Sequence, residues 1–185
     1  MFNLDILPFL YLLYLDNILL NIKREDTPIG TFRSYKGFYK PKNPTKYKGD
    51  PTNCIYRSLW ERRFMQYCDL NESIVGWSSE EVVVPYWSPL DNKPHRYYVD
   101  FWVKTMTAEG KEECMLIEIK PRNKTTKPEL GNKKMTRAKM NEMRDWIINS
   151  SKWEAAEKFC QARGWKFKVL TEKDIFGRGK ERNAP

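Results

Sequence analysis

The chain has 185 residues, enough for one domain with a sizeable buried core. Its 31% charged and 14% aromatic residues exclude a disordered polyelectrolyte and a membrane bundle. Lys and Arg number 33 against 24 Asp and Glu, and the resulting net charge of +9 favours a polyanionic partner, nucleic acid first. The net charge alone does not show whether the chain only binds a nucleic acid or also acts on it as an enzyme.

The positive charge is distributed unevenly along the chain. Residues 21–50 and 121–144 carry net charges of +5 and +6, whereas residues 51–120 carry −3. The four cysteines form no CxxC pair and His95 is the single histidine. This spacing argues against a zinc site and indicates reduced thiols in a cytosolic setting.

Residues 1–22 form an apolar N-terminal extension. Asp5, Pro8 and Asp16 interrupt it, so no uncharged run is long enough to cross a bilayer and no membrane span is expected. No basic residue precedes the apolar run and no cleavage site follows it, which argues against a secretory signal. Packing on the domain and docking on a partner both stay open.

Residues 23–50 make up a basic arm that is rich in proline, glycine and aromatic residues. Alternating cations and flat rings suit a segment that neutralises phosphates and stacks on bases, and the alternative is an arm wrapped on its own domain. The lysines of the arm that are expected to contact DNA are Lys36, Lys40, Lys42, Lys46 and Lys48.

A helix is predicted to begin near Thr52 or Asn53, which can serve as its N-cap. Aromatic residues recur at helical spacing after this point, and Glu61 lies at the border of the apolar face. A carboxylate at that border needs a partner. The partner is either a functional cation or an ordinary ion pair with Arg57 or Arg62.

Three strand-like runs follow the helix, and they cover residues 81–87, 96–104 and 113–120. A loop of odd length centred on Glu109 gives an antiparallel register that places Asp100 opposite Glu118. Lys120 lies on the same strand face as Glu118. Two facing carboxylates form a hard-oxygen site suited to Mg²⁺ or Mn²⁺, and the lysine adds a cation for a phosphate. The alternative is a surface ladder in which Lys120 pairs with one of the carboxylates.

The remainder of the chain predicts a basic stretch, two helices and a strand. The first helix covers residues 133–148, and Ser151 with Glu154 forms a capping box for the second, which ends near Arg163. A strand follows over residues 165–170. Three methionines of this region are expected in the core: Met135, Met140 and Met143. Basic residues after the third strand that are expected to contact DNA are Arg122, Lys124, Lys127, Lys133, Lys134 and Arg137.

Four segments of the chain resemble one known family. They are YKGFYKPKNPTKYKGDP, YRSLWERRFMQYCD, RYYVDF and IEIKP, which begin at residues 35, 56, 96 and 117. In these segments the chain resembles the PD-(D/E)xK restriction-endonuclease-like superfamily, in particular the branch of transposon end-cleaving endonucleases. More closely, it resembles the head completion nucleases of large contractile-tailed phages. The Pro-Asp pair of the superfamily is Val99-Asp100 here, which keeps the carboxylate in place.

The resemblance implies an α/β fold: a restriction-endonuclease-like mixed β-sheet flanked by helices, with an αβββαβ core. It also implies roles for five residues of this chain. Asp100, Glu118 and the carbonyl group of Ile119 would bind Mg²⁺ (or Mn²⁺). Lys120 would position the attacking water, and Glu61 would support a water or a second cation.

These observations predict a nuclease domain over residues 51–172 and a polar tail over residues 173–185. The expected activity is a Mg²⁺-dependent DNA endonuclease that hydrolyses phosphodiester bonds by a metal-activated water and acts on phage DNA during head completion. Double-stranded DNA and phage head or portal proteins are the expected partners, in the virion or the host-cell cytoplasm. Two alternatives stay open: a non-catalytic head or neck assembly protein with the nuclease fold, and a restriction or repair nuclease.

Overall fold

The computed structural model describes residues 36–129 and 135–176. The extension 1–22, the beginning of the arm, the last residues of the tail, and Lys133 and Lys134 lie outside the described residues. The helices are α2 (Leu59–Leu70), η3 (a 3₁₀ helix, Arg122–Lys124), α3 (Arg137–Gln161) and α4 (Glu172–Phe176). The strands are β1 (Gly37–Phe38), β2 (Ile55–Tyr56), β3 (Ile74–Ser79), β4 (Val83–Ser88), β5 (Lys93–Tyr98), β6 (Phe101–Met106), β7 (Glu112–Ile119) and β8 (Lys166–Leu170).

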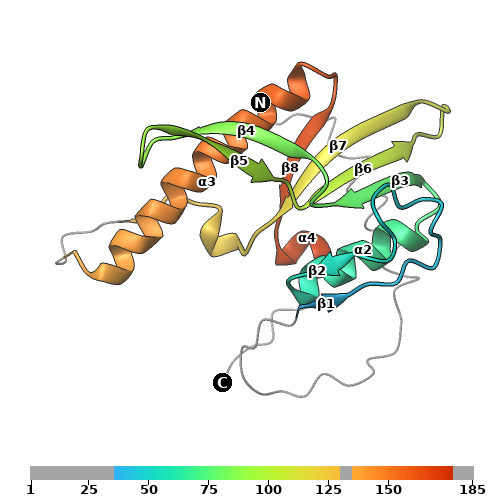
Figure 1. Ribbon diagram of the computed structural model, residues 1–185, viewed down its shortest axis with the longest axis horizontal. Helices are drawn as coiled ribbons and strands as arrows, with labels where there is room; N and C mark the ends of the chain where they lie inside the picture. Colours follow the sequence, from blue (N-terminus) through green and yellow to red (C-terminus); the bar gives the residue numbers. More distant parts are fainter. Residues whose placement is uncertain (1–35, 130–134, 177–185) are drawn as a thin grey trace.

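A four-stranded mixed sheet in the order β3-β6-β7-β8 lies at the centre of the domain (Figure 1). The pairs β3–β6 and β6–β7 are antiparallel, whereas β8 is parallel to β7. Side chains of α2 and α4 pack on one face of this sheet and side chains of α3 pack on the other. In chain order, α2, β3, β6, β7, α3 and β8 form the αβββαβ core of a restriction-endonuclease-like fold, which is the fold that the family resemblance implies.

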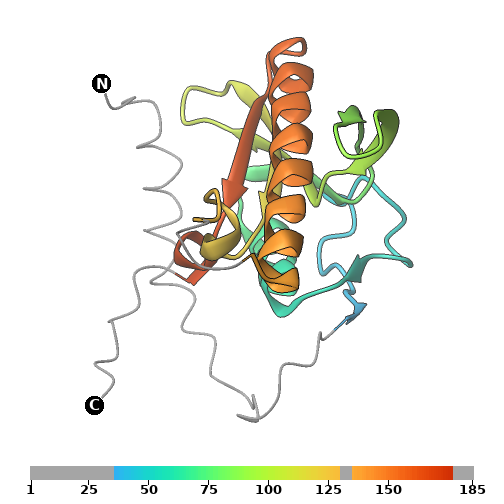
Figure 2. The same cartoon turned by 90° about the vertical axis from the view of Figure 1, so that its left-hand side faces the viewer.

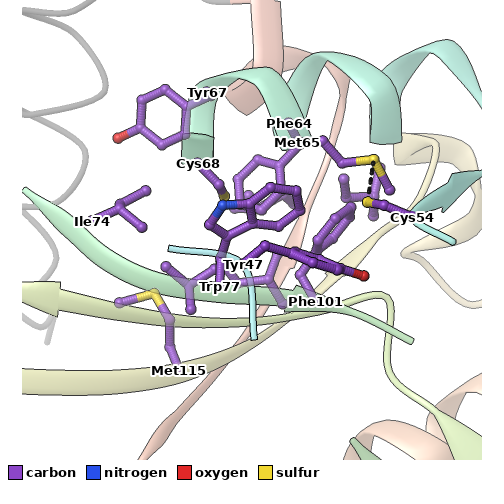
Figure 3. Close-up of a cluster of buried hydrophobic side chains, with 14 residues drawn as sticks. Tyr47, Cys54, Phe64, Met65, Tyr67, Cys68, Ile74, Trp77, Phe101 and Met115 are labelled. Atoms are coloured by element: carbon purple, nitrogen blue, oxygen red, sulfur yellow. Dashed lines mark hydrogen bonds between the residues drawn. The ribbon is translucent and has the colours of Figure 1, made fainter. Parts of the chain in front are cut away.

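The larger apolar cluster lies between α2 and the sheet (Figure 3). Trp77 is completely buried at its centre, with the Tyr47 ring 4.6 Å away between centroids. The Phe64 ring of α2 meets the Phe101 ring of β6 edge to face at 4.8 Å. Such aromatic pairs add to the free energy gained from burial, and they fix α2 on the sheet.

The buried carboxylate of Asp69 fastens the described part of the arm to α2. It accepts hydrogen bonds from the Tyr39 hydroxyl (2.9 Å) and from the backbone N–H groups of Lys42 (2.6 Å) and Asn43 (2.9 Å). The ammonium group of Lys46 donates to the Asp69 carbonyl at the end of the helix. The arm is therefore wrapped on its own domain from residue 36 onward.

Helix α2 begins later than the sequence predicts. Its N-cap is Ser58, whose hydroxyl accepts the Glu61 N–H (3.2 Å). Thr52 instead donates its hydroxyl proton to Asp50 (2.6 Å) within a turn. The prediction of Thr52 or Asn53 as the cap is wrong because this turn engages the hydroxyl first, and β2 then pairs with β1 before the helix can start.

The predicted run 96–104 is two strands that belong to different sheets. β5 pairs with β4 in a separate two-stranded sheet, the ribbon, and β6 joins the central sheet. At the junction the chain changes the face that it buries: Tyr97 and Val99 pack in the cluster under α3, whereas Phe101 packs in the cluster under α2. The first strand of the core is β3, which the sequence did not predict, and the run 81–87 belongs to the ribbon.

The two predicted C-terminal helices are one continuous helix, α3. The Ser151 hydroxyl donates to the Ile147 carbonyl (3.0 Å) within the helix and does not cap a new one. The first turns of α3 are exposed, so the expected core packing of Met135 (46% exposed) and Met140 (48% exposed) is wrong. In Figure 1 this end of α3 extends beyond the sheet.

No helix within residues 36–129 and 135–176 combines the length and apolar character that crossing a bilayer requires. The four cysteines are free thiols, and Cys54, Cys68 and Cys160 are buried.

Candidate active site

The register of β6 and β7 is the predicted one. Phe101 pairs with Ile117, and Trp102 pairs with Leu116. Asp100 immediately precedes β6 and therefore lies beside the end of β7. Its Oδ2 atom accepts a hydrogen bond from the Ile119 N–H at 2.8 Å. The backbone of β7 thus fixes the first carboxylate of the site.

The second carboxylate, Glu118, is 3% exposed. Its Oε2 atom accepts a hydrogen bond from the Tyr97 hydroxyl (2.7 Å), and its Oε1 atom lies 2.6 Å from the Lys120 ammonium nitrogen. Strand alternation explains this arrangement, because Ile117 and Ile119 occupy the apolar cluster on the opposite face. The structure therefore brings Asp100, Glu118 and Lys120 together as the sequence predicts.

The electrostatics of the site reflect two acids in a confined space. Burial and then the charge of Glu118 raise the pKa of Asp100 to about 8, although Lys120 and the Ile119 N–H oppose the shift. Burial lowers the pKa of Lys120, but the charges of Glu118 and Asp100 outweigh burial and the net pKa is raised. Burial and the charge of Glu118 also raise the pKa of Tyr97. Lys120 and Tyr97 are therefore protonated donors at neutral pH.

Glu61 lies near these residues but is held at the start of α2. Its carboxylate accepts hydrogen bonds from the Ser58 hydroxyl (2.8 Å) and the Arg57 N–H (2.7 Å). Its charge contributes to the raised pKa of both Asp100 and Lys120. Across the described segments, no three or more Asp, Glu, His or Cys side chains gather as a possible metal cluster. Glu61 is thus a charged neighbour of Asp100 and Lys120, held in place by hydrogen bonds of its own.

Sequence reasoning missed two features of the site. In a single strand over residues 96–104, alternation would place Tyr97 on the face opposite Asp100, and only the break between β5 and β6 brings its hydroxyl to Glu118. The second feature is Glu80, which has a positive φ of 56° and donates its N–H to the Asp100 carbonyl (3.1 Å). Its carboxylate binds the Arg57 guanidinium through two hydrogen bonds, at 2.7 and 2.8 Å. No local pattern in the sequence signals this pair.

The basic residues predicted to contact DNA differ in their surroundings. Lys46 is half-buried and donates to main-chain carbonyls, and Lys124 lies 3.7 Å from Asp145. Lys48 donates to the Thr45 carbonyl (2.9 Å) but is exposed. Lys133 and Lys134 are outside the described part of the chain. The remaining exposed candidates are Lys36, Lys40, Lys42, Arg122, Lys127 and Arg137.

The chemistry of the donor set fits a hard divalent cation. Asp100 and Glu118 contribute carboxylate oxygens, and the Ile119 carbonyl group is adjacent in the chain. Only Oδ2 of Asp100 accepts a hydrogen bond from the residues that the structure describes, so Oδ1 remains available as a ligand. Burial first, and then the charge of Glu118, raises the pKa of Asp100 in spite of the nearby Lys120 ammonium group. A cation would relieve this repulsion.

An αβββαβ core that carries facing carboxylates and a lysine at the end of one strand defines the class of restriction-endonuclease-like nucleases. Residues 71–172 match the family model described as TnsA-like endonuclease N terminal, and the chain belongs to this family. The chain is also 42% identical over 142 residues to the Head completion nuclease of Enterobacteria phage T4, an alignment that covers 75% of this chain and 92% of the relative. No solved structure matches the chain. These likenesses support a nuclease role.

Proposed function

We propose that the chain is a DNA endonuclease that depends on Mg²⁺ or Mn²⁺ and acts on phage DNA during head completion. The observation that carries the proposal is the meeting of Asp100, Glu118 and Lys120 in a partly buried site. The family supports the nuclease chemistry, and the printed name of the phage T4 relative supports the biological context.

The cation would be held by Asp100, Glu118 and the Ile119 carbonyl group. When bound, it supplies positive charge that stabilises the anionic transition state and lowers the pKa of a water molecule. The chain's own residues prepare the ligands. The Ile119 N–H orients the Asp100 carboxylate, and the Tyr97 hydroxyl orients that of Glu118.

Lys120 acts as a charged donor and not as a base. Its raised pKa keeps the ammonium group protonated at neutral pH, so it can hold the attacking water and a phosphate oxygen but cannot accept a proton. In the reaction, the attacking water loses a proton to solvent as its oxygen forms a bond to phosphorus, one P–O ester bond breaks, and the leaving oxygen takes up a proton from solvent. Protonated Lys120 stabilises the negative charge that develops on the phosphate.

The partners of the proposed enzyme are double-stranded DNA and proteins of the phage head or portal. Exposed lysines and arginines in residues 36–48 and 122–137 supply cations for the phosphate backbone. The virion or the host-cell cytoplasm is the proposed location. We propose Glu61 as a support for a water or a second cation, since it lies within electrostatic range of Asp100.

A cleavage assay tests the proposal. The purified chain is incubated with linear, supercoiled and branched DNA, with Mg²⁺, with Mn²⁺ or with a chelator. We expect cleavage with either ion, none with the chelator, and a loss of at least about a thousandfold in Asp100→Asn and Lys120→Ala. Asp50→Asn, an exposed aspartate in the turn before β2, is the matched control and should cleave as wild type.

Circular dichroism establishes that the inactive variants are folded. A wild-type chain that binds DNA but leaves all three substrates intact would support the non-catalytic assembly protein instead. Tolerance of Lys120→Ala would point the same way.

A further inference from the structure

The ribbon formed by β4 and β5 leaves the central sheet and returns to it at the candidate active site. At its base, the Val99 N–H donates to the Val82 carbonyl, and the Glu80 N–H donates to the Asp100 carbonyl (both 3.1 Å). Figure 2 shows the ribbon projecting from the body of the domain next to α3. Asp100 is therefore the residue that joins the ribbon to the sheet.

One face of the ribbon anchors it to the domain. Val84 and Tyr97 are 1% and 2% exposed and lie in the cluster that includes Ala156 of α3. The Lys152 ammonium group lies over the Tyr86 and Tyr97 rings, 5.7 and 5.3 Å from their centroids. The position of the ribbon relative to the site is therefore fixed by packing.

The opposite face is exposed and carries large aromatic side chains. Strand alternation and the register place Val83, Pro85 and Trp87 of β4 on this outer face, opposite Tyr98, Arg96 and Pro94 of β5. Trp87 is 57% exposed and Tyr98 is 49% exposed. The Trp87 indole N–H donates to the Asn92 side chain (2.7 Å), which limits the ring's freedom.

The charge on the outer face is that of Arg96, which lies between the two aromatic side chains. No acidic residue belongs to this face, and the structure shows no ion pair of Arg96 with any described carboxylate. Exposed aromatic rings that flank a free guanidinium fit a surface that contacts nucleic acid.

The edges of the ribbon are unsuited to pairing with a strand of another protein. Pro85 is the third residue of β4 and Pro94 is the second residue of β5, and proline has no N–H to donate. Because both residues still belong to the ladder, the missing donors fall on the outward edges. Each edge is therefore interrupted, which disfavours a protein strand as the occupant.

We propose that the outer face of the ribbon binds the groove of the DNA duplex beside the bond that is cut, with Trp87, Arg96 and Tyr98 as contact residues. The choice of DNA as partner rests on the proposed function. A two-stranded ribbon has the size of a DNA groove. Tyr98 is two residues from Asp100, and Trp87 lies four residue steps further, about 13 Å along the strands. The face thus spans about four base pairs, starting close to the cut.

The experiment measures binding and cleavage separately. Binding of a labelled duplex is followed by fluorescence anisotropy in the inactive Asp100→Asn protein without metal, and cleavage is followed in the active protein with Mg²⁺. The variants are Trp87→Ala, Tyr98→Ala, Arg96→Ala and the conservative Trp87→Phe. Leu70→Ala, an exposed apolar residue at the far end of α2, is the matched control.

We expect Trp87→Ala and Tyr98→Ala each to weaken binding at least about fivefold, with Trp87→Phe close to the parent protein. Arg96→Ala should lower the salt dependence of binding by about one unit of slope. Leu70→Ala should bind and cleave normally, and all variants should melt at the temperature of their parent.

Ribbon variants that bind and cleave DNA as Leu70→Ala does would overturn the inference and leave the proposed function intact. Variants that bind DNA normally but fail to associate with phage head proteins would overturn it in favour of a protein partner. A wild-type chain that does not cleave, with ribbon variants that still bind DNA more weakly, would remove the proposed function and support the ribbon surface.

Discussion

Asp69 is buried and Asp100 is half-buried, and the surroundings of these two carboxylates differ in one respect. Asp69 receives three hydrogen bonds, from the Tyr39 hydroxyl and two backbone N–H groups. Asp100 receives one, from the Ile119 N–H, and has Glu118 as a neighbour. The first carboxylate has its negative charge satisfied by the chain, and the second does not.

Asp69 is thus a structural acid, whereas Asp100 is the acid for which we propose a function. Satisfied hydrogen bonds stabilise the fold, whereas a poorly compensated pair of acids destabilises it until a cation binds. The unsatisfied charge at Asp100 therefore lowers the stability of the fold and attracts positive charge to the proposed site. Four predictions test this contrast.

The largest effect on stability is expected at the structural acid. Asp69→Asn turns an amide N–H₂ group toward backbone donors, and it should lower the free energy of unfolding by on the order of 2–4 kcal/mol. Urea unfolding measures the change, with the exposed Asp50→Asn as the control. Cleavage per folded molecule should stay at the wild-type level. A loss of cleavage in a fully folded Asp69→Asn protein would contradict the structural role.

Asp100→Asn should change the free energy of unfolding in the opposite direction and stabilise the fold. The folded pKa of Asp100, about 8, lies above its ordinary value of 3.8, so the folded state holds a proton that the unfolded state has lost between these pH values. Wild-type stability contributed by this group is present below pH 4 and is lost as the pH rises toward 8. Without metal, Asp100→Asn should be more stable than wild type at pH 8 by about 1–2 kcal/mol, with a flatter pH dependence. If the stabilities of wild type and Asp100→Asn depended on pH in the same way, the raised pKa of Asp100 would be contradicted.

Metal binding should remove the penalty at the functional acid. At a Mg²⁺ concentration ten times the dissociation constant, a bound cation stabilises the folded state by about 1.4 kcal/mol. Thermal melting with and without Mg²⁺ measures this shift in wild type. The Asp100→Asn protein should show little or no shift. Identical shifts in both proteins would place the cation elsewhere.

The smallest effects come from the tyrosines that hold the acids. Tyr97→Phe and Tyr39→Phe each remove a hydroxyl that donates to a carboxylate, and each should cost about 1 kcal/mol of stability. Only Tyr97→Phe should slow cleavage, by about tenfold, because it loosens Glu118. Equal cleavage rates in the two variants would show that the Tyr97 hydroxyl does not support the site.

The sequence predicted the site better than it predicted the elements around it. The register of β6 and β7 follows from one turn and strict alternation, so the meeting of Asp100 and Glu118 was predictable from local rules. Tyr97 was not, because its position depends on the change of sheet at Val99 and Asp100. Such a break between two strands depends on long-range packing. It does not change the alternation of apolar and polar residues, so the sequence pattern does not reveal it.

The misplaced elements have similar causes. β3 contains Gly76 and two serines, and it is held as a strand by its pairing with β6 and not by its own propensity. Ser151 resembles a helix cap in sequence, but α3 continues through it because the hydroxyl finds an acceptor one turn earlier. In both cases a partner distant from the local pattern decides the outcome.

The parallel pairing of β7 with β8 has a consequence for when the enzyme can form. Glu118 is paired with Val169, and the Lys120 N–H donates to the Leu170 carbonyl (2.9 Å), so the end of the site strand is held by the last strand of the sheet. Synthesis proceeds from the N-terminus, and a growing chain that has not reached residue 170 carries both carboxylates without the strand that aligns them. The proposed site therefore cannot be complete before residue 170 has been synthesised.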